Sequence, residues 1–423
     1  MTVNRRSFIK AVGATAALVA APAIVKSASN PRVIVVGGGF AGATAAKYIR
    51  MWSGYSIDVT LVDRNASHTS CILSNLVLNG SAQLSDLQLS YDLLAQKYGV
   101  EVVTDLVAEI DGDGQRVRLT NEGWRNYDRL IVATGIGFEK VPGLDFSVNP
   151  HAWIAGSQTQ LLEEMIRGTG ADSTFVMTIP ESPYRCPPGP YERACLVADR
   201  LIRRGYTSGD NPKVIVLDAN NDIQAEQATF SRAFNSLYGN ILQYIPNATL
   251  EAIEGGGTVA QTTIGEFHGD VINVIPVQRA TDLVRNAGLT GSGRWAPVDP
   301  LTYESTESGF QGVHVIGDSQ GTNQPKSGHM ANSQAKICAD AIVRSLYGLP
   351  TDTAERVENI TTNSACYSPI TADQASWLTA NFAYNSDLEQ MQLTHIGEAE
   401  QWNSKNYKQM FGWAKNLFHD SFY

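Results

Sequence analysis

Residues Tyr184–Glu192 place a thiol and a carboxyl in one short proline-rich segment, Tyr-Arg-Cys-Pro-Pro-Gly-Pro-Tyr-Glu. Its three prolines are expected to exclude helix and fix the backbone, so that Cys186 sits on a stiff loop. A helix predicted over Tyr191–Ile202 follows, and its N-terminus would lower the pKa of the thiol. The alternative is a structural cysteine in a turn. Because packing alone needs no rigid presentation, we favour a reactive cysteine.

Glu192 is the second group of this segment that could take part in chemistry. It follows Cys186 by six residues and lies about one turn into the predicted helix. A carboxyl in that place could handle the proton of a substrate. A glutamate in the first turn of a helix also complements the helix dipole without any catalytic role. The sequence leaves both interpretations of Glu192 open.

The position of this loop in the predicted fold limits the reactions in which Cys186 could take part. The segments Phe175–Ile179 and Lys213–Leu217 are predicted strands with a helix between them, which is the outline of a dinucleotide-binding unit. The turn after the first strand lacks the G-x-G-x-x-G spacing that accepts a pyrophosphate. A loop that presents a thiol in place of that turn indicates a redox enzyme acting on a sulfur substrate, with no nicotinamide bound there.

An intact dinucleotide-binding pattern follows the N-terminal segment of the chain, from Arg32. A predicted strand from Arg32 runs into Gly37, Gly39 and Gly42, and an alanine-rich helix follows. The first two glycines permit a tight turn and close approach to a pyrophosphate, and the third lets the helix pack on the strand. Asp63 ends the next strand, where a carboxylate can accept from a ribose hydroxyl. Strand, helix and terminal acid together predict a dinucleotide site.

Two later segments favour FAD over NAD at this site. Tyr127–Gly135 resembles a strand of flavoproteins that have two dinucleotide-binding domains, and Gly312–Asp318 resembles their late Gly-Asp motif. A helix expected after Ser327 could direct its N-terminus toward a flavin and stabilise its reduced form. The cofactor-binding residues predicted beyond the glycines and Asp63 are Arg64, Val107, Thr134, Gly135 and Asp318.

The N-terminus predicts export. Asn4–Lys10 contains twin arginines, and a short uncharged, alanine-rich run follows up to Val25, which is typical of a Tat signal removed near residue 28. We therefore expect a periplasmic protein whose mature chain has no transmembrane segment. The full chain carries a net charge of -10, and this predicted signal contains basic but no acidic residues. An acidic body argues against nucleic acid as a partner.

The chain has five cysteines, whose spacing matches neither a zinc site nor a C-x-x-C-H haem-attachment motif, so we predict no metal site. Cys195 and Cys338 lie within helical apolar patterns and are expected in the core. Residues alone would make Cys71 a buried structural cysteine. The C-terminal segment from Asn406 predicts a helix with a broad apolar face, suited to packing or, less well, to a membrane surface.

The chain resembles the flavoprotein subunit of flavocytochrome c sulfide dehydrogenase. The resemblance covers essentially the whole mature chain and rests on four strings: His68-Thr-Ser-Cys71 with Ser74-Asn75, Arg185-Cys-Pro-Pro-Gly-Pro-Tyr-Glu192, Pro325-Lys-Ser-Gly328 with Ala331-Asn-Ser-Gln-Ala-Lys336, and Asn363-Ser-Ala-Cys-Tyr-Ser368. The second string is quite specific. The sequence from Ala372 onwards departs from the pattern, which leaves the partner-binding surface less defined than the flavin site.

The resemblance implies an α/β fold like that of glutathione reductase, with two Rossmann-like domains and a C-terminal interface domain. We expect a signal over residues 1–28, an FAD domain formed by 29–147 and 275–345, an NAD-like domain over 148–274 and an interface domain over 346–423. The resemblance further implies that Cys71 bonds covalently to FAD, that Cys186 and Cys366 form a redox disulfide above the flavin, and that a separate c-type cytochrome subunit completes a heterodimer.

The activity implied is the oxidation of hydrosulfide at that disulfide, with electrons passing through FAD to the cytochrome. Two other functions stay open. A sulfide:quinone oxidoreductase would need a quinone channel and a membrane anchor, for which the terminal helix is the candidate. A non-catalytic redox flavoprotein that supports a sulfur-oxidation complex would show no sulfide turnover with artificial acceptors.

Overall fold

The glycine-rich segment near the N-terminus forms the expected βαβ unit. The computed structural model describes residues 30–206 and 213–423, and the predicted export signal lies outside the described residues. Strand β1 (Arg32–Val36) leads through the glycine turn into helix α2 (Phe40–Trp52), and β2 (Asp58–Asp63) lies parallel to β1.

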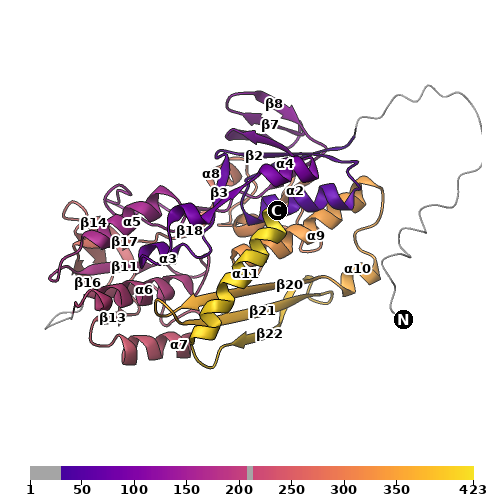
Figure 1. Cartoon of the computed structure of the whole chain (residues 1–423). Helices are drawn as coiled ribbons and strands as arrows, with labels where there is room; N and C mark the ends of the chain where they lie inside the picture. Colours follow the sequence, from indigo (N-terminus) through magenta and orange to yellow (C-terminus); the bar gives the residue numbers. More distant parts are fainter. Residues whose placement is uncertain (1–29, 207–212) are drawn as a thin grey trace, which may run out of the picture. The chain divides into compact units, whose positions relative to one another are not determined.

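A five-stranded parallel sheet, in the order β19-β9-β1-β2-β5, is built on this unit. Its other strands are β5 (Glu101–Thr104), β9 (Arg129–Val132) and β19 (Val313–Val315). Because β19 comes from a much later part of the chain, the sheet joins two distant segments. Helix α9 (Gly328–Leu346) follows β19 and packs along α2, as Figure 1 shows. Buried alanines on both helices allow this close packing.

A second parallel sheet, in the order β13-β12-β11-β17, lies under the cysteine loop. Its strands are β11 (Phe175–Ile179), β12 (Val214–Asp218), β13 (Leu242–Ile245) and β17 (Val271–Val274). Helix α6 (Gly189–Arg203) follows β11. The prediction that the prolines exclude helix throughout this loop is wrong at its end. Pro190 lies in the first turn of α6, where the N–H that proline lacks would have had no partner in the helix.

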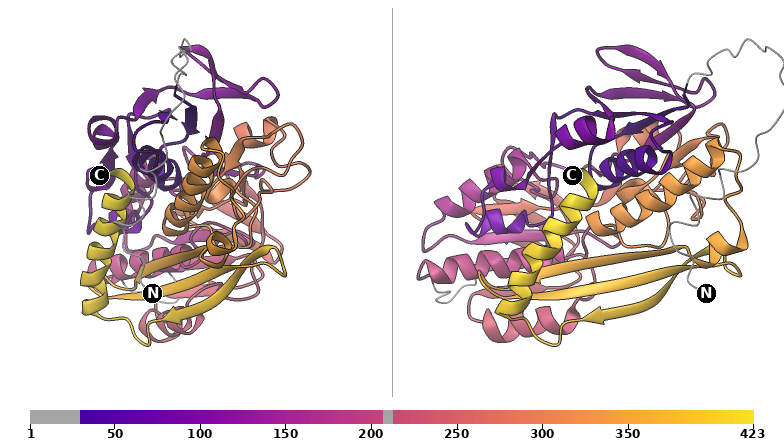
Figure 2. Two further views of the ribbon diagram at one scale, coloured as in Figure 1. Left: turned by 90° about the vertical axis from the view of Figure 1, so that its right-hand side faces the viewer. Right: turned by 45° about the vertical axis from the view of Figure 1, so that its right-hand side comes forward.

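A third, antiparallel sheet is formed near the C-terminus by β20 (Thr361–Pro369), β21 (Ala375–Asn385) and β22 (Gln390–Glu398). Helix α11 (Ser404–Phe422) crosses this sheet and continues to α2, which Figure 2 shows in two views. The inner face of α11 includes Met410, Ala414 and Leu417, as its apolar pattern predicts, whereas Phe411 is 43% exposed. The helix therefore serves as packing between two parts of the molecule.

Shorter elements complete the described chain. The small strands are β3 (Ser67–Thr69), β4 (Gln88–Ser90), β6 (Val107–Asp111), β7 (Arg116–Leu119), β8 (Gly123–Asn126), β10 (Ile136–Phe138), β14 (Leu250–Glu254), β15 (Val259–Thr262), β16 (Gly265–His268) and β18 (Gln278–Ala280). The remaining helices are α3 (Asn75–Leu78), η1 (Leu84–Leu87), α4 (Asp92–Tyr98), α5 (Ser157–Gly168), α7 (Gln227–Arg232), η2 (Ala233–Leu237), α8 (Asp282–Asn286), η3 (Gly317–Ser319) and α10 (Ala354–Glu358).

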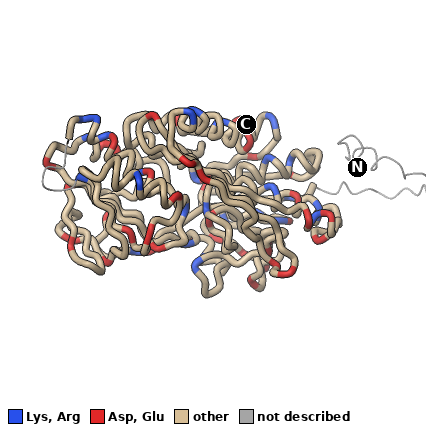
Figure 3. The backbone as a smooth tube through the Cα atoms, turned by 90° about the horizontal axis from the view of Figure 1, so that it is seen from below, with Lys and Arg blue, Asp and Glu red and all other residues tan. Residues whose placement is uncertain are grey.

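These elements confirm the predicted α/β class with two Rossmann-like sheets. Within residues 30–206 and 213–423, no helix has the length and apolar character needed to cross a bilayer. Figure 3 shows Lys and Arg intermixed with Asp and Glu along the outer turns and helices of this part of the chain. The positions of individual side chains in one pocket decide what chemistry this framework supports.

Candidate active site

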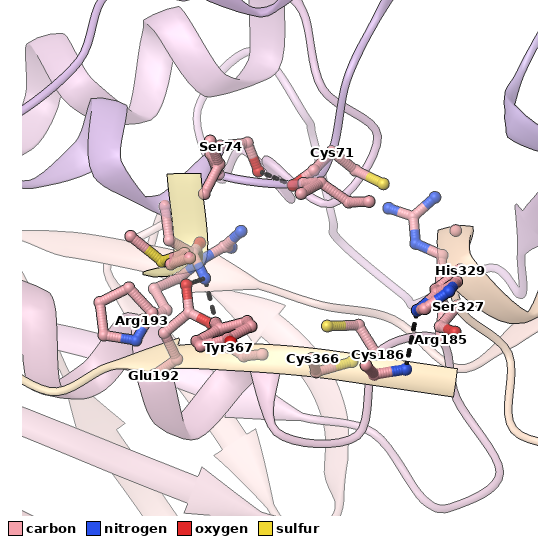
Figure 4. A pocket seen from close by; sticks show the side chains of 18 of the residues that line it. Cys71, Ser74, Arg185, Cys186, Glu192, Arg193, Ser327, His329, Cys366 and Tyr367 are labelled. Carbon is pink, nitrogen blue, oxygen red and sulfur yellow. Dashed lines mark hydrogen bonds between the residues drawn. The ribbon is translucent and has the colours of Figure 1, made fainter. Parts of the chain in front are cut away.

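One pocket collects the cysteines that the sequence singled out. Cys71, Cys186 and Cys366 all line it, together with Glu192, although they come from four separate elements or loops. Figure 4 shows Cys71 on the opposite side of the pocket from the two other cysteines. The fold therefore brings together residues that lie up to 295 positions apart in the sequence.

The loop before α6 holds Cys186 in an unusual backbone conformation. Its φ is 55°, in the left-handed region that residues other than glycine rarely adopt. The Cys186 N–H donates to the Lys326 carbonyl at 2.7 Å, and the Gly189 N–H donates to the Cys186 carbonyl at 2.8 Å. A Cβ at Gly189 would lie 3.0 Å from the Cys186 sulfur and 2.8 Å from the Trp153 ring. Gly189 thus leaves the space that the thiol occupies.

Residues at the start of α9 also fix the strand that carries Cys366. The Ser327 and Ser364 hydroxyls are hydrogen bonded at 2.7 Å, and the Ala365 N–H donates to His329 Nδ1 at 3.0 Å. Cys366 follows directly in β20, opposite Leu378 of β21. Because Lys326 holds the Cys186 loop, one short segment positions both cysteines.

The thiols of Cys186 and Cys366 are direct neighbours. A hydrogen bond with Cys366, followed by burial, raises the pKa of the Cys186 thiol well above its usual range. The prediction that the helix N-terminus lowers this pKa is therefore wrong for the reduced pair. The effect of a neighbouring sulfur and a poorly solvated pocket exceeds that of the α6 dipole. Two thiols within hydrogen-bonding reach have the composition and proximity of a redox pair.

Cys71 lies between β3 and α3, partly buried, and its carbonyl accepts the Ser74 hydroxyl at 2.8 Å. Burial raises the pKa of its thiol, and the nearby positive charge of Arg185 acts in the opposite direction. Cys195 and Cys338 are both 0% exposed, which confirms their predicted place in the core.

Glu192 lies in the first turn of α6 and faces the same pocket. Asn75 Nδ2 donates to its Oε1 at 2.9 Å. Burial raises the pKa of Glu192 to about 8, and the Asn75 hydrogen bond opposes that rise. A carboxyl with this pKa exchanges a proton near neutral pH, which is what a general base requires.

Arg193, the next residue in α6, fixes the orientation of Glu192 through Asn75. Its side chain is 1% exposed and donates to Asn75 Oδ1 at 3.0 Å, to Asn273 Oδ1 at 2.9 Å, and to the carbonyls of His151 at 3.0 Å and Ala152 at 2.6 Å. Asn75 in turn holds Glu192, so one buried guanidinium orients the amide that fixes the carboxyl.

Arg193→Met should lower the free energy of unfolding by about 3 kcal/mol, because it removes a donor from four buried acceptors, of which the His151 carbonyl keeps a second donor in Asn273 Nδ2. Urea unfolding of the variant would measure this loss. The matched control is Arg167→Met, since the Arg167 side chain is 65% exposed and pairs only with Glu163 among the described ion pairs. That change should cost about 0.5 kcal/mol or less. Equal losses in the two variants would contradict the structural role of Arg193.

The glycine turn of the first βαβ unit has the shape that a pyrophosphate needs. Gly37 has a φ of 101°, and a Cβ there would lie 2.5 Å from the Ala133 carbonyl oxygen. A Cβ at Gly42 would lie 1.8 Å from the Gly37 oxygen, so only glycine permits this packing of α2. At Gly39 the nearest atom to an added Cβ is His68 Cε1 at 3.7 Å, which leaves the turn open at the start of α2. Asp63 accepts the Gly38 N–H at 2.6 Å and so holds the turn.

Three charged side chains lie where the sequence predicts the flavin end of the FAD site: Asp318, Lys326 and Arg185. Asp318 lies after β19, and its Oδ1 is buried without a hydrogen-bond partner among the described residues. Lys326, 5% exposed, donates to the Gln320 carbonyl at 2.6 Å, and burial lowers the pKa of its ammonium to about 7. Arg185 Nη1 lies 4.0 Å from Asp318 Oδ2. An unpartnered carboxyl oxygen beside the start of α9 fits a hydroxyl-bearing ligand such as the ribityl chain of FAD.

The other predicted cofactor residues surround this region in different ways. Thr134 Oγ1 is hydrogen bonded to Thr281 Oγ1 at 2.7 Å, and the Gly135 carbonyl accepts the Ser319 hydroxyl. Val107 starts β6 with a buried side chain, and Arg64 is exposed directly after β2. Arg185 and Lys326 are site residues that were not predicted from the sequence, although both lie within the strings Arg185–Glu192 and Pro325–Gly328.

The second Rossmann-like sheet has aromatic side chains where a nicotinamide cofactor would need space. Asp218 ends β12 and accepts the Tyr191 hydroxyl at 2.8 Å and the Tyr244 hydroxyl at 2.9 Å. Tyr191 lies in the first turn of α6 and is 0% exposed. The acid that could bind a ribose is thus already bonded within the protein, which agrees with the missing glycine motif.

Two families of known proteins match parts of this chain. The family described as "Sulfide dehydrogenase [flavocytochrome c] flavoprotein chain, central" matches residues 159–276, and "Pyridine nucleotide-disulphide oxidoreductase" matches residues 31–163. The sulfide dehydrogenase [flavocytochrome c] flavoprotein chain of Chlorobaculum thiosulfatiphilum is 52% identical over 46 residues, which are 94% of that sequence and 11% of this chain. The chain belongs to the sulfide-oxidising flavoproteins. This membership implies a flavin cofactor, which the glycine turn and Asp318 fit.

Other sulfide-oxidising flavoproteins resemble the chain over a greater length. The mitochondrial sulfide:quinone oxidoreductase of Mus musculus is 23% identical over 322 residues, covering 70% of this chain and 66% of that protein. The structure of the sulfide:quinone oxidoreductase from Aquifex aeolicus has a TM-score of 0.76 at 16% identity, covering 93% and 92% of the two chains. The latter likeness shows the fold alone. The chain spans 66%, 27% and 58% of the first three curated relatives.

Proposed function

We propose that this chain is the flavoprotein subunit of a periplasmic sulfide dehydrogenase. It oxidises hydrosulfide at a Cys186–Cys366 disulfide beside FAD and passes electrons to a c-type cytochrome subunit. One observation carries the proposal: the two thiols are hydrogen bonded to each other in a pocket that Cys71 and Glu192 also line. The predicted domain boundaries, the export signal and the heterodimer belong to the same proposal.

In the oxidised pair, hydrosulfide attacks one cysteine sulfur. A sulfur–sulfur bond forms to the substrate, the disulfide bond breaks, and its electron pair leaves on the other cysteine as a thiolate. Glu192 takes the proton of the attacking sulfur. Arg185 is a cation close to both Cys71 and Cys186, and its charge favours the thiolate form of these cysteines. The substrate sulfur is thus oxidised while the disulfide is reduced.

The residues that would hold the flavin are the Gly37–Gly42 turn for the pyrophosphate, Asp318 for the ribityl chain and Cys71 for a covalent bond. Bound there, FAD supplies a two-electron acceptor that can release electrons singly. Asp218 and its tyrosine partners support an acceptor other than a nicotinamide, because they occupy the second dinucleotide site.

An anaerobic titration with sulfide tests the proposal. The flavin absorbance should bleach with sulfide alone, and the reduced protein should pass electrons to a c-type cytochrome. The alternative is a sulfide:quinone oxidoreductase, which the sequence similarity to the mitochondrial enzyme of Mus musculus over 322 residues favours. Faster reoxidation by a short-chain quinone than by cytochrome c would support that alternative. Failure of sulfide to bleach the flavin would refute both.

Cys71→Ser should release the flavin into the supernatant on acid precipitation, whereas the unchanged protein should retain it in the pellet on a peptide that contains Cys71. Serine preserves the size of the side chain but forms no thioether. Peptide mass mapping of the pellet measures the difference. The matched control is Cys195→Ser, which alters a cysteine away from the flavin. Flavin that washes free of the unchanged protein would exclude the covalent bond.

A further inference from the structure

Glu226 is a second buried acid that the chemistry above does not use. It is 1% exposed and precedes α7, with a φ of 49° in the left-handed region. Its Oε1 is buried without a hydrogen-bond partner among the described residues. A strained backbone and an unsatisfied carboxyl oxygen are costly in a protein core, and such features concentrate at functional positions.

The second oxygen of this carboxyl is bonded to the strand that carries Cys366. Oε2 of Glu226 accepts the Ser368 hydroxyl. Ser368 is 0% exposed and lies between Tyr367 and Pro369, which both line the cysteine pocket. Glu226 therefore binds the strand that forms this side of the pocket, at a serine two residues after Cys366.

The charge of Glu226 acts on Glu192 of the pocket, and the charge of the surface residue Glu398 acts on Glu226. The charge of Glu226 raises the pKa of Glu192, and both carboxyls raise the pKa of Cys195, one turn after Glu192 in α6. Glu398, exposed on the edge strand β22, acts on Glu226 in the same way. The groups that interact electrostatically or through hydrogen bonds with Glu226 are therefore Glu192 and Cys195 of α6, Ser368 of β20, Ser376 of β21 and Glu398 of β22.

We propose that Glu226 is a proton-relay residue, which takes the proton of the substrate from Glu192 and passes it to solvent beside Glu398. This inference rests on the proposed sulfide oxidation.

The oxidation of hydrosulfide releases a proton that has to leave the pocket. Each hydrosulfide oxidised to the level of sulfane sulfur gives up two electrons and one proton, and a one-electron acceptor removes only electrons. The proton must therefore leave a pocket whose base, Glu192, is itself buried. The repulsion between the two carboxylates is mutual, so a proton that arrives on Glu192 makes Glu226 easier to ionise.

The proton affinity of Glu226 suits this role. Burial raises its pKa to about 7, while the hydroxyls of Ser368 and Ser376 oppose the rise. A carboxyl that gains and loses a proton near neutral pH can transfer one in every turnover.

The test uses the flavin-loaded protein with ferricyanide as the one-electron acceptor, so that it needs no partner. Glu226→Gln keeps the size of the side chain but carries no exchangeable charge. We expect steady-state turnover to fall about tenfold or more at pH 7, while the first anaerobic reduction of the flavin by sulfide keeps its rate within about twofold. Glu226→Ala should show the same defect, and formate, a small acid that fits the vacated space, should restore turnover.

Ser368→Ala provides a second variant that retains the carboxyl. Removing the donor should move the pH dependence of turnover upward, because that hydrogen bond lowers the pKa of Glu226. Asp218→Asn is the matched control, a buried acid of the same domain that does not line the pocket. It should lose stability without gaining a response to formate.

Turnover of Glu226→Gln at the normal rate, or a loss in Glu226→Ala that formate does not reverse, would overturn the relay. If sulfide failed to reduce the flavin of the unchanged protein, the proposed function itself would fail instead.

Discussion

Cys186→Ser and Cys366→Ser should each slow flavin reduction by sulfide, on the order of a thousandfold or more. A serine oxygen cannot form a disulfide, so each single variant keeps one cysteine but leaves hydrosulfide without a disulfide bond to attack. Either change alone should therefore be as severe as both together, because the two cysteines act as one unit. Anaerobic stopped-flow mixing with sulfide, followed at the flavin absorbance, measures this rate directly.

Cys338→Ala is the matched control for loss of a cysteine. Cys338 is 0% exposed within α9 and contacts the core of the first sheet, away from the pocket. Its removal should cost about 1 kcal/mol of stability and leave the rate unchanged. A Cys186 or Cys366 variant whose flavin is reduced within tenfold of the normal rate would contradict the disulfide mechanism.

The fold was predictable from the sequence wherever short-range patterns determine it. Gly37 and Gly42 mark a turn that only glycine permits, and the strand after β1 ends at Asp63 as expected. The helix after the cysteine loop starts two residues earlier than predicted, because Pro190 is compatible with the first turn of a helix. Local stereochemistry thus predicts these elements apart from their exact ends, whereas no local pattern predicted the antiparallel sheet of β20, β21 and β22.

The site was predictable in its residue types but not in its electrostatics. The pKa of Cys186 rises where a decrease was expected, because the fold places Cys366 next to it. The two cysteines are 180 positions apart in the sequence. No local pattern distinguishes Glu226 from an ordinary surface glutamate. Its burial depends on Ser368 in a strand that comes 142 residues later. Long-range packing determines both effects, and residue spacing carries no information about it.

The two interpretations of Glu192 that the sequence leaves open make different predictions. Glu192→Gln should lower the rate of flavin reduction by sulfide by about 10²-fold to 10⁴-fold, which is the usual contribution of a general base. Glutamine can still accept the Asn75 amide hydrogen bond that holds the position. If Glu192 only complemented the dipole of α6, the same change would cost about 1 kcal/mol of stability or less and leave the rate unaltered.

The pH dependence gives the second criterion. A base acts in its deprotonated form, and burial raises the pKa of Glu192 to about 8. The rate in the unchanged protein should therefore increase as the pH rises through about 8, and the increase should vanish in Glu192→Gln. Glu163→Gln is the control, since Glu163 pairs with Arg200 and Arg167 on α6 and α5 and does not line the pocket. A pH profile that stays the same in Glu192→Gln would assign the proton transfer to another group.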